Sequence, residues 1–259
     1  MAHDGMSNTA PPDGQGPQLI LVGDSHVKAL HAGCMAHGIP AAMLKSGGIH
    51  WNAGKIRVFA PRRARSPVLP ALTPDIRTLE QTLGHSDIFD SGLPVIASVG
   101  FHCGHLARAF GAEGHIAWPP PEDLSDAERQ ESLFASGALV AAFVENQRAP
   151  HFALLKYIAR KCPLTVILPP RAPKNAHKIR FRHNIDVLTA TIAERMRDMG
   201  LAVYDPNAEF AGPGELLPWD WVEEDGFHGT TAYGTEVIGR LVSRGALAPA
   251  QTGTREPAP

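Results

Sequence analysis

Five short apolar runs, each ended by Gly, Pro or polar residues, constrain the fold of this chain most strongly. They span residues 18–22, 39–44, 93–99, 164–168 and 202–204. A short apolar run bounded by such residues is typical of a buried strand. Segments with helical spacing or long loops follow the runs, and this alternation predicts a parallel sheet with helices on both faces. We therefore expect an α/β domain built on a five-stranded parallel sheet.

The segments between the runs carry helix signals. Thr73 is placed to cap a helix that begins at Pro74, and Ser125 with Glu128 matches a capping box. Gly200 ends a long amphipathic stretch. The sequence predicts helices over 26–37, 74–83, 125–146, 150–161, 176–199 and 230–243, and substrate-covering surface loops over 55–74 and 111–124.

The two ends of the chain differ in composition from its centre. Residues 1–17 are polar and rich in Gly, Pro and Asp, and residues 246–259 are rich in Pro, Ala and Thr. Such segments bury too little apolar surface to order themselves. With 259 residues and 44% hydrophobic residues, the centre has enough material for one sizeable core. We expect a disordered leader over 1–17, one domain over 18–245 and a flexible tail over 246–259.

Charge and cysteine content exclude several classes of protein. The 24 Lys and Arg residues nearly balance the 26 Asp and Glu residues, so the sequence offers no basic face for nucleic acid. Three widely spaced cysteines do not form a disulfide framework. The start lacks the apolar run of a signal peptide, and no run is long enough to cross a membrane. These features predict a cytoplasmic protein that binds neither nucleic acid nor membrane.

Polar and glycine-rich segments lie where the predicted strands end. Residues 23–26 follow the first strand, residues 47–48 the second and residues 100–102 the third, while residues 225–228 precede the last helix. The carboxyl ends of parallel strands meet at one edge of a sheet, where ligands bind in open α/β folds. These four segments are therefore expected to converge.

The residue types in these segments point to acyl transfer through a serine. A serine hydroxyl becomes an effective nucleophile when a base removes its proton, and Ser25 and His228 supply that pair. Asp225 is placed to orient the imidazole. The Ser25 N–H, at a strand-to-helix turn, and the N–H of Gly47 or Gly48 would stabilise the oxyanion, with Gly48 preferred. Asp24 is expected to fix the turn by local hydrogen bonds.

Two of these segments also resemble a known family. Gly23-Asp24-Ser25 resembles the first block of the SGNH (GDSL-like) hydrolases, and Asp225-Gly226-Phe227-His228-Gly229-Thr230 resembles their closing Asp-x-x-His block. The resemblance implies a three-layer, flavodoxin-like fold and hydrolysis or transfer of ester groups on sugars, lipids or small molecules. It also implies a catalytic triad of Ser25, Asp225 and His228. We expect no cofactor.

The chain departs from that family after the third strand. The family has Gly-x-Asn there, with the Asn side chain donating to the oxyanion, whereas this chain has Gly100-Phe101-His102. A neutral imidazole N–H is also a donor, so His102 is the third predicted oxyanion group. The sequence therefore predicts a serine esterase acting on an acyl ester, such as an acetyl ester, of a carbohydrate or small molecule. An acyltransferase and a catalytically silent binding domain are the alternatives.

Other polar residues leave more than one interpretation open. His26, His50, Trp51 and Asn52 are candidates either for a substrate cleft or for plain surface positions. The segment His102-Cys103-Gly104-His105 does not have a recurring metal-ligand spacing, so no metal site is predicted. The sequence does not define an oligomeric state.

Overall fold

The computed structural model describes residues 16–52, 56, 70–112, 114–171, 179–212 and 215–247. Its main sheet pairs five strands in parallel in the order β2-β1-β3-β6-β7. Among these five strands, that is the 2-1-3-4-5 order of flavodoxin-like sheets. The predicted fold class is confirmed. The strands are β1 (Leu19–Gly23), β2 (Ala41–Lys45), β3 (Val95–Ser98), β6 (Leu164–Ile167) and β7 (Ala202–Tyr204).

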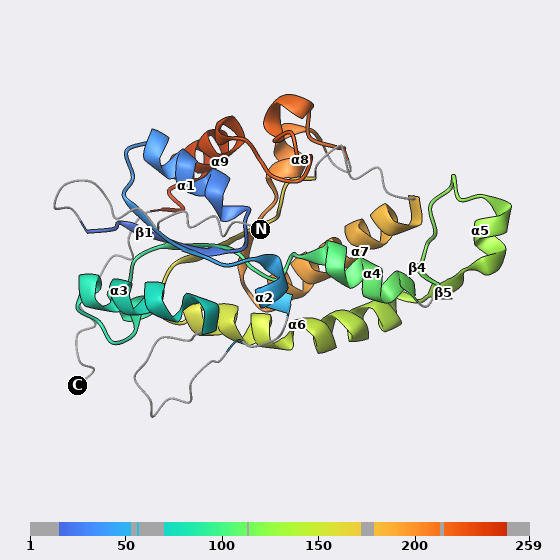
Figure 1. Cartoon of the computed structure of the whole chain (residues 1–259), viewed down its shortest axis with the longest axis horizontal. Coiled ribbons are helices and arrows are strands. Elements are labelled where there is room, and N and C mark those ends of the chain that lie inside the picture. The colour runs from blue at the N-terminus through green and yellow to red at the C-terminus, as the bar shows by residue number, and fades with distance from the viewer. Residues whose placement is uncertain are drawn as a thin grey trace, which may run out of the picture.

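Helices cover both faces of this sheet, which gives three layers (Figure 1). One face carries α1 and α9, and the other carries α3, α4, α6 and α7. The helices are α1 (Val27–Ala36), α2 (Gly48–Asn52), α3 (Thr73–Leu83), α4 (Cys103–Ala112), α5 (Asp126–Glu131), α6 (Gly137–Ala159), α7 (Ile179–Asp198), α8 (Pro206–Phe210) and α9 (Thr231–Ser243).

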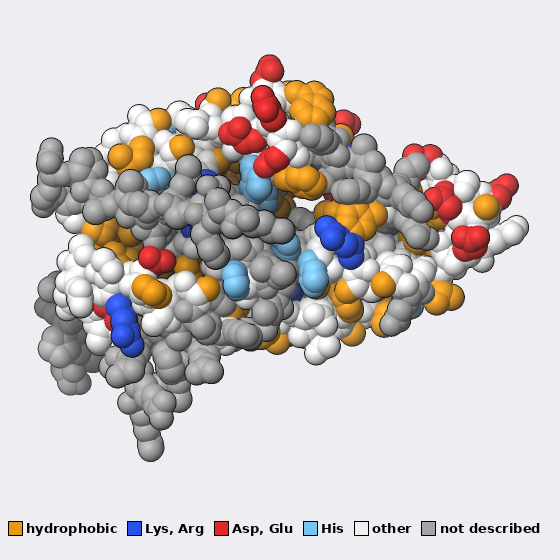
Figure 2. Space-filling model, in the orientation of Figure 1, with side chains coloured by type: hydrophobic (Ala, Val, Ile, Leu, Met, Phe, Trp, Pro, Cys, Tyr) orange, Lys and Arg blue, Asp and Glu red, His pale blue; other side chains and the backbone are white. Residues whose placement is uncertain are grey.

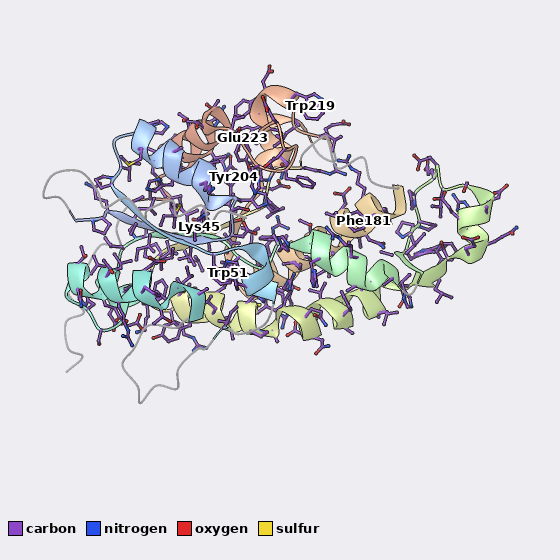
Figure 3. All side chains as sticks on the ribbon, viewed as in Figure 1. Lys45, Trp51, Phe181, Tyr204, Trp219 and Glu223 are labelled. Carbon is purple, nitrogen blue, oxygen red and sulfur yellow. The ribbon has the colours of Figure 1, made fainter. Side chains whose placement is uncertain are left out.

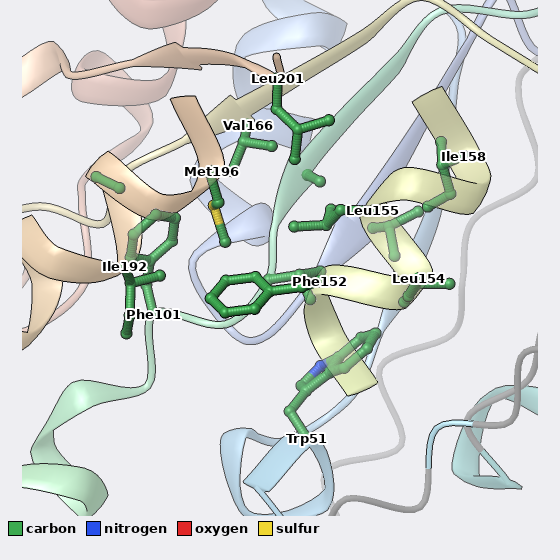
Figure 4. Close-up of a cluster of buried hydrophobic side chains, with 14 of the residues drawn as sticks. Trp51, Phe101, Phe152, Leu154, Leu155, Ile158, Val166, Ile192, Met196 and Leu201 are labelled. Atoms are coloured by element: carbon green, nitrogen blue, oxygen red, sulfur yellow. The ribbon is translucent and has the colours of Figure 1, made fainter. Parts of the chain in front are cut away.

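Alternation along the strands divides the core in two. In β1, Leu19 and Leu21 pack toward α1 and α9, whereas Ile20 and Val22 pack on the opposite side. Successive side chains of a strand point to opposite faces, so a strand covered on both sides reads as a continuous apolar run. Figure 4 shows part of the second core, in which side chains of α6 and α7 meet the sheet.

The first and last helices of the domain pack unusually closely. A Cβ atom added at Gly234 of α9 would lie 1.8 Å from the Ala29 carbonyl oxygen of α1, and one at Gly33 would lie 2.2 Å from the Gly234 carbonyl oxygen. Only glycine at both positions permits this approach. Because α1 lies near the start of the chain and α9 near its end, this contact places the segments that precede the two helices on the same side of the sheet.

The structure corrects the predicted start of α3. The N-cap residue is Leu72 rather than Thr73, and among the described residues no side chain caps this helix. A 3-10 turn over Pro70–Leu72 leads directly into α3, so the chain is already helical where the sequence predicts a cap.

The structure also differs from the two helices predicted over 125–146 and 150–161. Ser125 and Glu128 do form the capping box, but α5 ends at Glu131. A second helix, α6, then begins after the N-cap Ser136 and continues through Pro150 to Ala159. Residues from both sides of Pro150 are buried on this helix, so packing outweighs the hydrogen bond that a proline removes.

Two strands were not predicted. β4 (His115–Ala117) and β5 (Leu133–Ala135) form a separate parallel pair, and with α5 they lie at the end of the molecule farthest from α3 (Figure 1). The segment 111–124 is therefore partly strand, although the sequence predicts a loop. Trp118 and Phe134 make an exposed edge-to-face contact there.

The predicted domain boundaries can be followed only in part. Residues 1–15 of the leader, 248–259 of the tail and most of the loop over 55–74 lie outside the described residues. Pro17 is buried, and Ala246 and Leu247 pack against the core beneath α1 and α9. The leader over 1–17, the domain over 18–245 and the tail over 246–259 therefore stay predictions.

Candidate active site

Ser25 lies in the turn between β1 and α1. The Asp24 backbone N–H donates to the Ser98 carbonyl oxygen of β3, and its carboxylate accepts the His26 backbone N–H at 3.0 Å. These bonds agree with the turn-fixing role predicted for Asp24. Ser25 is half-buried just ahead of the first turn of α1, where backbone N–H groups face the end of the sheet.

His228 lies on a short loop that leads into α9. An antiparallel bridge between Val222 and Gly229 closes this loop, and the Glu223 N–H donates to the His228 carbonyl oxygen at 2.8 Å. Gly226 has a φ of 73°, a left-handed conformation that favours glycine. Thr230 then caps α9 by accepting the Tyr233 N–H. The Asp-Gly-Phe-His segment is thus a hydrogen-bonded turn that leads directly into α9.

A chain of hydrogen bonds links the three predicted triad residues. The Nε2 atom of His228 lies 2.6 Å from the Ser25 hydroxyl oxygen. Its Nδ1 atom lies 2.5 Å from one carboxylate oxygen of Asp225. The other oxygen of that carboxylate accepts the backbone N–H groups of Phe227 and His228, at 2.8 and 3.1 Å. The structure therefore brings together residues separated by 203 positions in the chain.

The charge of Asp225 determines which nitrogen of His228 carries the proton. Burial favours the neutral acid, but hydrogen bonds from the His228 ring and from the two backbone N–H groups prevail and lower the pKa of Asp225 to about 2. An ionised carboxylate only accepts hydrogen bonds. The His228 Nδ1 atom must then be the donor to Asp225, and the Nε2 atom is left as the acceptor for the Ser25 proton.

An open cleft of about 630 Å³ lies over this triad. Charged groups line it on both sides, with Lys28 on α1 and Glu223 and Glu224 on the loop before His228. Figure 3 shows Glu223 beside α1, on the other side of the sheet from Trp51. In the space-filling view, acidic side chains and histidines gather near each other on this face (Figure 2).

His26 is a site residue whose role the sequence left undecided. Its ring centroid lies 5.1 Å from that of His228, and it lines the cleft beside Ser25. Burial lowers the pKa of His26, with Asp24 opposing the shift and His228 adding to it. Among the described residues, no hydrogen-bond partner reaches its buried Nδ1 atom. A second, neutral imidazole thus packs against the triad histidine, and its position directly after Ser25 was the only sequence signal.

Gly48 and His102 lie in direct contact. A Cβ atom added at Gly48 would lie 2.2 Å from the Nδ1 atom of His102, so the imidazole occupies the space that a side chain would take. Among the described residues, a Cβ atom added at Gly47 would meet only His50, at 3.7 Å. The glycine next to His102 is therefore Gly48, the preferred candidate. Although His102 is exposed as a residue, its ring is partly shielded from water by its neighbours, and this is the largest cause that lowers its pKa, with Asp24 opposing the shift.

Gly48, His102 and the remaining candidate residues are not among the residues that line this cleft. Trp51 is buried in the core, with its ring centroid 6.4 Å from that of His151. Both interpretations that the sequence left open for Trp51, a cleft residue or a surface residue, are therefore wrong. His50 is exposed, and the side chain of Asn52 is not described. Cys103 is buried whereas His102 and His105 are exposed, so these three side chains do not share one surface. Within the described ranges, no helix is long and apolar enough to cross a membrane.

Comparison with known proteins finds similarity only at the level of structure. No protein-family model matches the chain, and no curated protein does. An extracellular lipase from Streptomyces rimosus is 16% identical over 87% of this chain and 98% of its own, with a TM-score of 0.46. A phospholipase A1 from Streptomyces albidoflavus is 18% identical over 89% and 98%, with a TM-score of 0.44. Most of this chain is also similar to a GDSL-like lipase from Bacteroides thetaiotaomicron, at 12% identity over 88% of this chain and 86% of that one, with a TM-score of 0.43.

Proposed function

We propose that this chain is a serine esterase that hydrolyses an acyl ester of a carbohydrate or another small polar molecule. One observation carries the proposal: an unbroken hydrogen-bonded chain from the Ser25 hydroxyl through the His228 imidazole to the Asp225 carboxylate. The same three side-chain types in this order activate serine nucleophiles on unrelated folds. The open cleft above them gives water and substrate access to the serine.

The arrangement assigns a role to each group. The Nε2 atom of His228 takes the Ser25 proton as the serine oxygen attacks the ester carbonyl, and the same nitrogen then returns the proton to the leaving alcohol. The ionised Asp225 offsets the charge of the imidazolium that forms. The N–H groups of Ser25 and Gly48 and the ring of His102 are the proposed donors to the oxyanion. In the second half of the reaction, the Nε2 atom of His228 takes a proton from water as the water attacks the acyl group on Ser25, and it then returns the proton to the Ser25 oxygen as the free acid leaves.

The lining of the cleft supports a polar alcohol as the leaving group. Lys28, Glu223, Glu224 and Thr231 offer hydrogen-bond donors and acceptors around the triad, as the hydroxyl groups of a sugar require. A long alkyl chain would desolvate these charged groups without replacing their hydrogen bonds. We therefore place carbohydrate and small-molecule esters ahead of long-chain lipids.

A serine-directed probe tests the proposal. Wild-type protein should react with a fluorophosphonate and turn over p-nitrophenyl acetate, and Ser25→Ala should lose both activities. Ser243→Ala is the matched control, because that side chain is exposed and its hydroxyl donates to the Arg240 carbonyl oxygen of its own helix. Wild-type protein that neither reacts with the probe nor cleaves the ester would refute the proposal and favour a binding domain. Acylated sugar instead of free acid, in the presence of acceptor sugars, would reassign the chain as an acyltransferase.

A further inference from the structure

Arg148 is a buried arginine beneath the segment that carries His102. It lies on α6, and only 1% of its surface is exposed. Its Nε atom donates to the Gly100 carbonyl oxygen at 2.7 Å, and its Nη2 atom donates to the His102 carbonyl oxygen at 3.4 Å. One planar guanidinium therefore holds both ends of the segment 100–102. Burying an arginine is costly, so these bonds to backbone carbonyls are important for keeping it there.

The rest of this segment fits tightly against the core. Gly100 has a φ of 92°, and a Cβ atom added there would lie 3.3 Å from the Cε atom of Met196. Phe101 is buried among the side chains of α6 and α7, as Figure 4 shows. His102 follows with its ring on the outer side, against Gly48. The place of that ring thus follows from the backbone of residues 100–102.

The positive charge in this cluster belongs to Arg148. His151, one turn further along α6, is also buried, and burial together with Arg148 lowers the pKa of its imidazole to about 3. His151 is therefore neutral at pH 7. An arginine keeps its charge in proteins, and its fork of donors is rigid, so it fixes two carbonyl groups at once in a way that lysine does not.

We propose that Arg148 is a positioning residue: it fixes the backbone of residues 100–102 and so keeps the ring of His102, the proposed oxyanion donor, against Gly48. The inference rests on the proposed esterase function. It means that Arg148 acts on kcat through His102 and has little effect on substrate binding, because an oxyanion forms only during reaction. The effect of replacing Arg148 on kcat should therefore disappear in a variant in which His102 has already been replaced by alanine.

A double-mutant cycle measures this dependence. With p-nitrophenyl acetate, Arg148→Met should lower kcat by about 10-fold or more with KM changed less than about threefold, on the scale of a weakened oxyanion donor. In a His102→Ala background, the same change should lower kcat less than about twofold. Arg148→Lys should lie between wild type and Arg148→Met. Equal losses in both backgrounds would overturn the proposal, even with an active esterase.

A control variant separates positioning from general stability. Arg129 on α5 also donates to backbone carbonyls, those of Leu124, Pro121 and Glu122, but it lies on the far arm of the molecule. Arg129→Met should leave kcat within about twofold of wild type. If Arg129→Met lowers kcat as much as Arg148→Met at an equal loss of thermal stability, the proposal is wrong.

A second measurement tests the inference if the chain is not an esterase. In ¹⁵N-histidine NMR spectra of the full chain, Arg148→Met should shift or broaden the His102 ring signals and leave those of exposed His50 unchanged. The Arg148→Lys spectrum gives the same test if Arg148→Met does not fold. An unmoved His102 signal in folded variants would overturn the positioning role. A moved signal in a protein without esterase activity would keep that role and reject the proposed function.

Discussion

Substitution of Gly48 by alanine tests the oxyanion arrangement with a change of one methyl group. The added Cβ atom would lie 2.2 Å from the His102 Nδ1 atom and 2.5 Å from Cε1, far inside the 3.4 Å of an ordinary contact. The imidazole must therefore move by more than 1 Å. Because His102 is exposed, the ring can swing away with little strain, and the free energy of unfolding should change by less than about 1 kcal/mol.

The effect on catalysis should be much larger than the effect on stability. A donor hydrogen bond is effective only over a few tenths of an ångström around 2.9 Å, so a displacement above 1 Å removes it. Loss of one oxyanion donor lowers kcat by roughly 10²–10³-fold. Gly47→Ala is the control, since its Cβ atom would meet only His50 at 3.7 Å. Steady-state kinetics with p-nitrophenyl acetate and urea unfolding measure both quantities. Wild-type kcat in folded Gly48→Ala would refute the role of His102 as a donor.

Three further changes test other parts of the structure. Gly234→Ala forces α9 away from the α1 backbone and should lower the free energy of unfolding in urea by about 1–3 kcal/mol or more. Gly239→Ala on the same helix meets the ring of His37, which can move, and should cost less. Equal costs would contradict the close packing of α1 and α9. Asp225→Asn should lower kcat by about 10⁴-fold, because an amide N–H would favour the wrong imidazole tautomer, and a near-normal rate in the kinetic assay would contradict the triad. The pKa of His151 is about 3 in the folded chain and higher in the unfolded chain. Between these two values the unfolded chain binds more protons, so the free energy of unfolding falls as the pH drops from about 6 to 4. His151→Phe should reduce that slope by up to about 1.4 kcal/mol per pH unit in urea unfolding, and exposed His50→Gln should not; an unchanged slope in His151→Phe would count against this origin.

Much of this fold was predictable because its strands carry their own signal. A strand covered on both faces is apolar along nearly all of its length, and the run 164–168, in which Thr165 is the one polar residue, is recognisable for that reason. The triad was predictable because Ser25 follows such a strand and Asp225 and His228 precede a capped helix. Their meeting also depends on Gly33 and Gly234, whose close contact has no periodic pattern that would reveal it.

The missed elements lack a local signal. β4 and β5 have three residues each, too few to show a period, and in the part of the chain that the structure describes they pair only with each other. Pro150 normally marks the start or the end of a helix, so the sequence favours two helices where burial along one face sustains a single long one. Arg148 resembles any exposed helical arginine, since the carbonyl groups that hold it are 46 to 48 residues away.

Each helical layer contributes a different half of the candidate site. The contact of α1 with α9 brings the nucleophile to its base, whereas the segment 100–102 is held from the other side of the sheet by α6 and α7. Disturbing one layer should therefore leave the other half in place. Gly234→Ala should slow fluorophosphonate labelling of Ser25 while the NMR signals of the His102 ring stay unchanged. Arg148→Met should shift or broaden those His102 signals. If a change in either layer moves both halves, the sheet does not separate them and the site responds as one unit.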